Sequence, residues 1–230
     1  MNKEEYNTIK ENKSVYAGIH LFLTTKCNLK CPNCSAGIHK FHKETFTSIE
    51  DIKRMAPFFQ NLEHLYLTGG EPTLHPDFFL ISANIRDWYK PKKLLLWTNG
   101  YVSYNKILAF KYYDTIHVTQ YDENSYEGSP NNKEQIEKVL RVFYNNRLFE
   151  ERNTKILVGD VAHFDMKHNK GGNPCERINY GLYPVIHGRV YPCCVAPGVG
   201  TTKSVPVNER WLENITKTDV PCENCVFGEE

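Results

Sequence analysis

Apolar residues occur along most of the chain as short runs separated by longer stretches with helical spacing. Each short run has the length of a strand and is followed by polar or turn-forming residues. The runs cover residues 18–23, 64–67, 93–97, 115–119 and 155–158. Strands that alternate with helices are typical of a parallel sheet. The pattern therefore predicts an α/β fold, a partial β/α barrel of five β-α units that is open on one side.

Helical spacing follows three of the predicted strands. The sequence Thr47-Ser48-Ile49-Glu50 resembles a capping box and stands before apolar residues that recur every three or four positions. A second helix is predicted across residues 76–88 and a third across 134–144. The third has one apolar face, made by Ile136, Val139, Leu140 and Phe143. We expect these faces to cover the sheet.

The alternation stops after Gly159, and the sequence becomes rich in Gly, Pro and Cys. We therefore predict a domain boundary near residues 165–174. It divides the chain into an N-terminal extension (1–17), a core (18–168) and a C-terminal extension (169–230). The extension is predicted to contain a β-hairpin that turns at Gly188 and a helix that begins near Trp211.

Charge and composition narrow the class of protein. The 230 residues are 40% hydrophobic, which is enough for a buried core, and 28 Lys plus Arg nearly balance 27 Asp plus Glu. No excess of charge points to a nucleic acid or an anionic membrane as partner. No apolar run is long enough to span a bilayer, and residues 1–14 lack the apolar stretch of a signal peptide. We expect a cytoplasmic protein, in which eight cysteines indicate metal binding rather than disulfides.

Three of the cysteines, Cys27, Cys31 and Cys34, follow the first predicted strand directly. In β/α barrels the active site assembles at this end of the strands. Three thiolates on one loop can hold three corners of a 4Fe-4S cluster and leave the fourth iron open. A structural zinc site is the alternative, with His39 or His42 as the fourth ligand.

The Cys-x3-Cys-x2-Cys spacing resembles the signature of the radical S-adenosylmethionine (radical SAM) superfamily. The resemblance implies that the open iron binds S-adenosylmethionine (SAM). It also implies that an electron from a one-electron reductant such as flavodoxin or ferredoxin cleaves SAM to a 5′-deoxyadenosyl radical, which takes a hydrogen atom from the substrate. Many relatives have an aromatic residue just before the last cysteine, where this chain has Asn33, so the adenine contacts stay unassigned.

A second motif supports the resemblance. Thr68-Gly69-Gly70-Glu71-Pro72 ends the second predicted strand and is similar to the family's Gly-Gly-Glu-Pro motif in every residue. Two glycines allow a sharp turn and a close approach of the backbone to a ligand. The resemblance assigns Gly69, Gly70, Glu71 and Pro72 to the methionyl amino group of SAM. Its position one β-α unit after the cysteines favours the cluster over zinc.

The ends of the next two strands supply weaker candidates for the SAM pocket. Thr98-Asn99-Gly100 resembles a Thr-Asn-Gly sequence found there in the family, although an ordinary Asn-Gly turn is the alternative. Thr119 and Gln120 end the fourth predicted strand, where relatives have polar contacts to the ribose and the methionyl carboxylate.

Five further cysteines lie in the C-terminal extension. Their spacing resembles that of the auxiliary-cluster extensions called SPASM and, in the short form, twitch. The resemblance implies a second 4Fe-4S cluster, and the Gly188-x4-Cys spacing selects Cys193 rather than its neighbour Cys194. The implied ligands are Cys175, Cys193, Cys222 and Cys225. A zinc site with four cysteines is the alternative.

Two clusters suggest a reaction class. An auxiliary cluster with four cysteine ligands is suited to accept an electron, so we expect oxidation or remodelling of a small polar molecule such as a sugar or an aminocyclitol. A maturase acting on a ribosomal peptide is one alternative, and a non-catalytic iron-sulfur or zinc protein is another. Side chains near the strand ends could act as the base, but the sequence does not select one of them. They are Tyr121, Asp122, Asp160 and His163.

Overall fold

The computed structural model describes the core strands, their helices and part of the C-terminal extension. The described residues are 18–31, 34, 38, 43–121, 130–147, 149, 153–160, 182–191 and 204–216. The strands are β1 (Gly18–Thr24), β2 (His64–Gly69), β3 (Lys93–Thr98), β4 (Thr115–Gln120), β5 (Lys155–Asp160), β6 (Leu182–Ile186), β7 (Arg189–Val190) and β8 (Val205–Pro206). The helices are α2 (Ile49–Met55), α3 (Phe78–Tyr89), α4 (Tyr104–Ile107), α5 (Lys133–Tyr144) and α8 (Trp211–Thr216), with 3-10 turns η2 (Ala56–Phe58), η3 (Pro72–Leu74) and η4 (Leu108–Tyr112).

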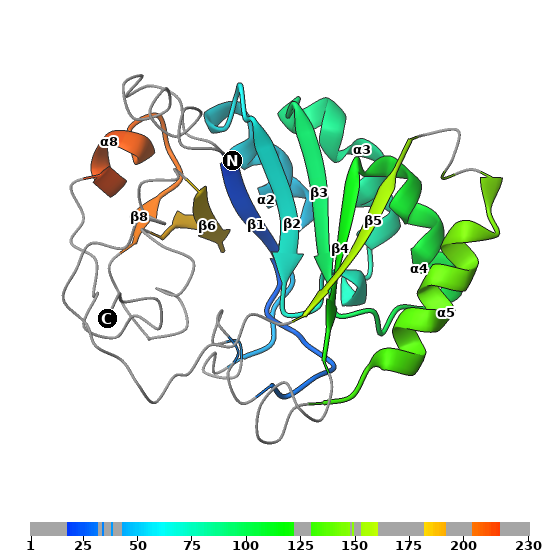
Figure 1. The fold of residues 1–230 in the computed structure, drawn as a ribbon. Coiled ribbons are helices and arrows are strands. Elements are labelled where there is room, and N and C mark those ends of the chain that lie inside the picture. The colour runs from blue at the N-terminus through cyan, green and yellow to red at the C-terminus, as the bar shows by residue number, and fades with distance from the viewer. Residues whose placement is uncertain are drawn as a thin grey trace, which may run out of the picture.

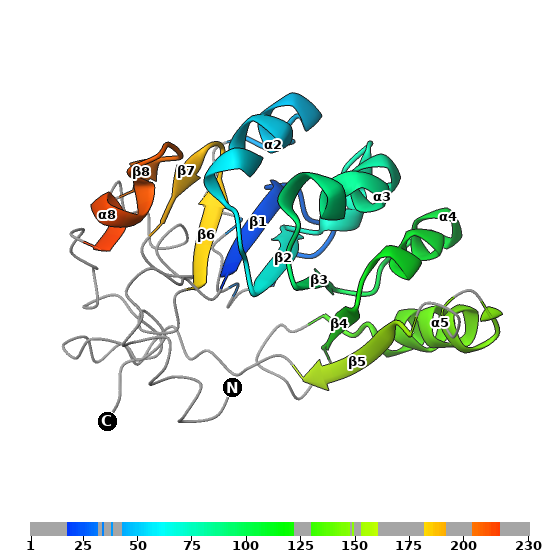
Figure 2. The same cartoon turned by 90° about the horizontal axis from the view of Figure 1, so that it is seen from above.

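The strands form one sheet in the order β5-β4-β3-β2-β1-β6-β7-β8. The first six pair in parallel, and β7 and β8 are added antiparallel. Strands β5 and β8 stand at opposite edges, so the sheet is curved but not closed (Figures 1 and 2). The predicted α/β fold and the five core strands are confirmed.

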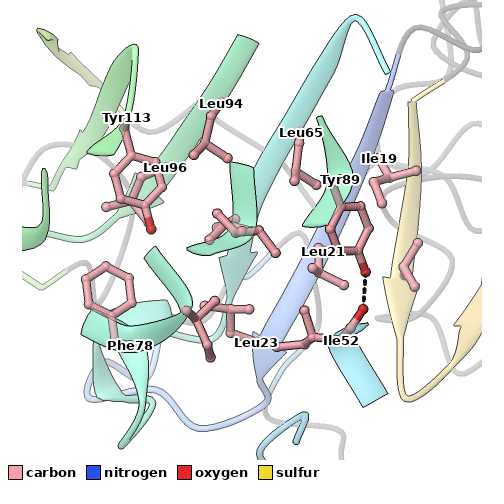
Figure 3. Packing of buried hydrophobic residues seen from close by; sticks show 14 of the residues in the cluster. Ile19, Leu21, Leu23, Ile52, Leu65, Phe78, Tyr89, Leu94, Leu96 and Tyr113 are labelled. Atoms are coloured by element: carbon pink, nitrogen blue, oxygen red, sulfur yellow. Dashed lines mark hydrogen bonds between the residues drawn. The ribbon is translucent and has the colours of Figure 1, made fainter. Parts of the chain in front are cut away.

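Helices α2 to α5 cover one face of this sheet (Figure 2). Alternate strand residues point into that layer, and Ile19, Leu21, Leu65 and Leu96 are among those with no exposed surface. Helix α3 closes the layer through hydrogen bonds as well as packing, because the Tyr89 hydroxyl donates to the carbonyl of Ile52 at 2.8 Å (Figure 3). The main hydrophobic core therefore lies between the sheet and the helices.

The beginning of α2 differs from the predicted capping box by one residue. Ser48, not Thr47, is the N-cap, and its hydroxyl accepts a hydrogen bond from the Asp51 amide. The Thr47 hydroxyl donates instead to the carbonyl of Phe22 in β1, at 2.8 Å. The sequence prediction also missed the short helix α4 and the turn η4, because elements of four and five residues are too short to show a helical stripe.

The C-terminal elements join the same sheet and the same core. Strand β6 pairs in parallel with β1, and β6 and β7 form the predicted hairpin with its turn at His187 and Gly188. The predicted helix at Trp211 is α8, and the Trp211 indole donates to the carbonyl of Phe58 at 3.0 Å. The boundary between residues 168 and 169 stays a prediction. Within the described part of the chain, no helix has the length and apolar character needed to cross a membrane.

Candidate active site at the carboxyl ends of the strands

The three predicted cluster ligands lie on the loop that follows β1. Cys27 and Cys34 are half-buried and Cys31 is buried. Threonine side chains fix the base of this loop, since the Thr24 hydroxyl donates to the carbonyl of Thr45 at 2.7 Å and accepts from the Lys26 amide at 2.9 Å. The loop therefore leaves the strand along one defined path.

The double-glycine turn after β2 packs directly against this loop. The Gly70 amide donates to the carbonyl of Thr24 at 2.9 Å, and the Glu71 amide donates to the carbonyl of Lys26 at 2.8 Å. A Cβ atom on Gly69 would lie 2.4 Å from the Thr24 oxygen, and one on Gly70 would lie 2.2 Å from the Lys26 oxygen. Gly69 also has a φ of 147°. Glycine is required here because any side chain would separate the turn from the cysteine loop.

The Glu71 carboxylate is fully buried and links the ends of two strands. One of its oxygens accepts from the amide and hydroxyl of Thr73 and from the Thr98 hydroxyl, and the other accepts from the Asn99 amide at 2.8 Å. Burial raises the pKa of Glu71, while these four hydrogen bonds favour the ionised form and oppose the rise. Glu71 therefore holds the turn after β2 against the end of β3. Pro72 begins the turn η3 immediately after it.

Asn99 connects the end of β3 to the cysteine loop. Its side-chain amide donates to the Asn28 side chain at 2.8 Å and lies 3.9 Å from the sulfur of Cys27. Its backbone carbonyl accepts from the Asn132 side chain at 2.6 Å. Asn99 is 7% exposed, so these contacts form in a nearly enclosed position.

The sequence prediction missed Asn132, which precedes α5. Its side-chain amide bonds the carbonyls of Asn99 and Thr119, and its side-chain oxygen accepts from the Tyr121 amide at 2.7 Å. Asn132 is 1% exposed. It thereby ties the ends of β3 and β4 together. An asparagine just before a helical stripe was the only signal in the sequence, and that signal is also typical of an ordinary helix cap.

The structure brings most of the predicted residues of the core to one end of the sheet. The cysteine loop, Gly69 to Pro72 and Thr98 to Asn99 share one hydrogen-bonded network, and Thr119 and Gln120 end the neighbouring strand β4. Their contacts with SAM stay predictions. Other candidates lie outside the residues, or the side chains, that the structure describes. These are Asn33, His39, His42, Asp122, Asp160, His163, Cys175, Cys193, Cys194, Cys222 and Cys225.

The cysteine loop has the donor set that an iron-sulfur cluster requires. Burial, together with the nearby Glu71, Cys31 and Cys34, raises the pKa of the Cys27 thiol to about 12, although a hydrogen bond from the Leu29 amide opposes the rise. Such a thiol ionises only if a cation replaces its proton, as iron does. Phe22, Ile38 and Ile186 pack beside Cys27 and Cys34 and form an apolar wall. Among the described residues, no group of three His, Cys, Asp or Glu side chains is arranged to hold a single metal ion.

The family model for the radical SAM superfamily matches residues 21–146, which is more than half of the chain. The chain therefore belongs to the radical SAM superfamily, and it is an enzyme of that class. Membership implies a 4Fe-4S cluster and SAM as cofactors.

Curated relatives share one segment with the chain. The GTP 3′,8-cyclase of Actinobacillus pleuropneumoniae serotype 3 is 38% identical over 90 residues, which are 37% of this chain and 26% of that protein. The GTP 3′,8-cyclase of Haemophilus ducreyi is 39% identical over 90 residues, again 37% of this chain and 26% of that protein. The match thus spans about a quarter of these relatives, whose activity does not transfer on this basis.

Solved structures confirm the fold over a longer range. A structure of BtrN in complex with AdoMet and 2-DOIA has a TM-score of 0.61 at 16% identity, and the match covers 90% of this chain and 84% of that one. SuiB of Streptococcus suis bound to S-adenosylmethionine has a TM-score of 0.55 at 13% identity, and the match covers 94% of this chain and 69% of that one. At these identities the likeness shows the fold alone.

Proposed function

We propose that the enzyme binds a 4Fe-4S cluster on Cys27, Cys31 and Cys34 and uses SAM to remove a hydrogen atom from a small polar substrate, such as a sugar or an aminocyclitol. One observation carries the proposal. The loop with the three thiols packs against the double-glycine turn of the adjacent parallel strand through two backbone hydrogen bonds, at the end of the sheet where active sites of this fold class assemble.

The chain's own residues bind and orient the cofactors in this proposal. The three cysteines would hold three irons, and the backbone of the Gly69-Gly70 turn, packed against the cysteine loop, would bind the methionyl group of SAM beside the fourth. Glu71 does not need to touch SAM, because all four of its hydrogen bonds go to Thr73, Thr98 and Asn99. It positions the turn. When bound, the reduced cluster and SAM supply a carbon radical that abstracts hydrogen.

We further propose that Cys175, Cys193, Cys222 and Cys225 of a twitch-like extension would hold an auxiliary 4Fe-4S cluster, which could take one electron from the substrate radical while a base takes its proton. Tyr191, at the end of the hairpin, packs against the apolar group of Phe22, Ile38 and Ile186, and Cys27 and Cys34 pack against the same group. Tyr191 stands two positions before the proposed ligand Cys193 in the sequence, which supports a place for one auxiliary ligand near the first cluster.

Iron and sulfide counts after anaerobic reconstitution test the ligand sets. The wild-type chain should hold about eight irons, and either C27A/C31A/C34A or C222S/C225S should lose about four. Cys194→Ser is the matched control and should lose none. Four irons in the wild type, or unchanged iron in C222S/C225S, would refute the auxiliary cluster but leave the first one standing. Bound zinc in place of iron at Cys27, Cys31 and Cys34 would refute the central assignment.

A further inference from the structure

The face of the sheet opposite the helices carries a group of aromatic side chains, which we call the ring cluster: His20 of β1, Tyr66 of β2, Trp97 of β3 and His117 of β4. Trp97 is its centre, with ring centroids 4.9 Å from His20, 5.4 Å from Tyr66 and 6.1 Å from His117. The two imidazoles stand nearly perpendicular to the indole, at 88° and 75°. Trp97 nevertheless keeps 40% of its surface exposed.

The ring cluster lies close to the cysteine loop. Trp97 and Asn99 are two residues apart at the end of β3, and the Asn99 side chain reaches the Cys27 sulfur at 3.9 Å. Two residues of a strand span about 7 Å. A molecule that lies on the exposed indole would therefore be next to the site proposed for the SAM cluster.

Two polar groups of the ring cluster can form hydrogen bonds with a ligand. Within the described part of the chain, neither the Tyr66 hydroxyl nor the His117 imidazole forms a side-chain hydrogen bond, although both residues are half-buried. Polar groups in such positions usually have a partner. Burial lowers the pKa of His117 and raises that of Tyr66, so both are uncharged near neutral pH.

The strand residues that share this face carry no carboxylate in the described part of β1 to β5. Their polar side chains are threonine hydroxyls, imidazoles and the tyrosine hydroxyl, with Lys93 and Lys155 at the opposite ends of their strands. Among the described strand residues of this face, a cationic amino group would find no counter-charge. An uncharged ring would find the exposed part of the Trp97 indole to stack on and neutral hydrogen-bonding groups beside it.

We infer that the ring cluster binds an uncharged ring of the substrate, which stacks on the exposed part of Trp97 and directs its polar substituents to Tyr66 and His117. This inference rests on the proposed function and narrows its substrate class. A neutral sugar or a heteroaromatic ring fits this surface better than an amino sugar does.

Isothermal titration of the reconstituted enzyme, with SAM bound, tests the inference with three ring compounds. Glucose and guanosine are the neutral probes, saturated and aromatic, and glucosamine is the cationic match to glucose. At least one neutral probe should bind at millimolar concentration, more tightly than glucosamine. Trp97→Ala should weaken that binding about tenfold or more, as for the loss of an aromatic stacking partner. Tyr66→Phe, which removes only the hydroxyl, should weaken it by a smaller factor.

Trp88→Leu is the matched control, because Trp88 lies on α3 beneath Lys53, on the helix side of the molecule. It should leave the affinity unchanged. Three results would overturn the inference: no binding of either neutral probe, preference for glucosamine, or equal affinity in Trp97→Ala and the wild type. A parallel loss of SAM affinity in Trp97→Ala would show that the cluster holds the adenine of SAM, which also overturns it. Iron content and SAM cleavage are measured separately. A failure of the proposed function would appear in those two measurements, whereas a failure of this inference alone would appear only in the titrations.

Discussion

The two faces of the sheet use neighbouring residues for opposite purposes. Leu96 points into the helix layer and has no exposed surface, whereas Trp97, the next residue, points to the other face and is 40% exposed. On the helix-covered face the buried apolar side chains of β1 to β4 are aliphatic, whereas the open face carries the rings of His20, Tyr66, Trp97 and His117. Because successive strand residues alternate between faces, one short sequence builds the core and a surface for a ligand. In each pair of neighbouring strand residues, we therefore expect substitution of the core residue to lower the free energy of unfolding and substitution of the open-face residue to lower ligand affinity.

Substitution of the pair Leu96 and Trp97 should give the largest contrast. Leu96→Ala removes a fully buried side chain, so we expect the free energy of unfolding to fall by about 3 kcal/mol. Trp97→Ala should change it by less, about 1 kcal/mol, because the indole is partly exposed and outside the main core. Urea denaturation of the two variants measures this difference. A larger loss for Trp97→Ala would show that the open face is part of the core.

Glu71 offers the next test, since its effect comes from hydrogen bonds rather than from apolar burial. Glu71→Ala leaves four donors without their acceptor, which should cost about 2 kcal/mol or more. Glu71→Gln keeps one side-chain oxygen and should cost less. Thermal unfolding and SAM binding are measured together. If Glu71→Gln lost SAM binding with no change in stability, Glu71 would be a direct SAM ligand and not a positioning residue.

Asn132→Ala should have a smaller effect on stability, about 1 to 2 kcal/mol, because it unpairs two carbonyls and one amide, which are fewer groups than Glu71→Ala leaves unpaired. Since Asn132 joins the ends of β3 and β4, we also expect weaker SAM binding, measured by titration of the reconstituted protein. The exposed neighbour Asn131 supplies the control variant, Asn131→Ala. If Asn132→Ala bound SAM with wild-type affinity, the end of β4 would not be part of the SAM site.

His75 should give the smallest effect, visible only as a pH dependence. Burial lowers the pKa of His75 below the ordinary value of 6.5, and the charge of Lys106 adds to this, whereas the hydrogen bond to the carbonyl of Thr47 and the Asp77 carboxylate oppose it. The unfolded chain therefore binds the proton more readily, and the stabilising contribution of His75 is present above pH 6.5 and is lost as the pH falls below it. In His75→Gln, stability should fall less steeply over that range. Equal slopes in both proteins would contradict the assignment.

Much of the fold could be predicted because local patterns determine it. All five core strands match the predicted runs to within two residues, since each run alternates or is wholly apolar and ends at a turn. The parallel pairing of β6 with β1 could not be predicted, because it joins residues more than 160 positions apart and leaves no local periodicity. The extension was predicted as a separate unit for the same reason.

The candidate site shows a similar division. The cysteines and the double glycine could be recognised because their chemistry requires particular residue types at fixed spacing. The positioning role of Glu71 could not be recognised, since its partners come from the turn η3 and from the end of β3 and meet only after folding. Asn132 was missed because an asparagine before a helix looks the same in the sequence whether it caps that helix or is buried and bonds two other strand ends. The ring cluster was missed because His20, Tyr66, Trp97 and His117 are each isolated in the sequence.

The most direct test of the central assignment is the formation of 5′-deoxyadenosine by the anaerobically reconstituted enzyme with SAM and dithionite. We predict that the wild-type chain forms it and that the variant lacking Cys27, Cys31 and Cys34 does not, while Trp88→Leu cleaves SAM like the wild type. The absence of 5′-deoxyadenosine from a wild-type protein with a full iron content would contradict the account, as would its formation at the wild-type rate by the triple cysteine variant.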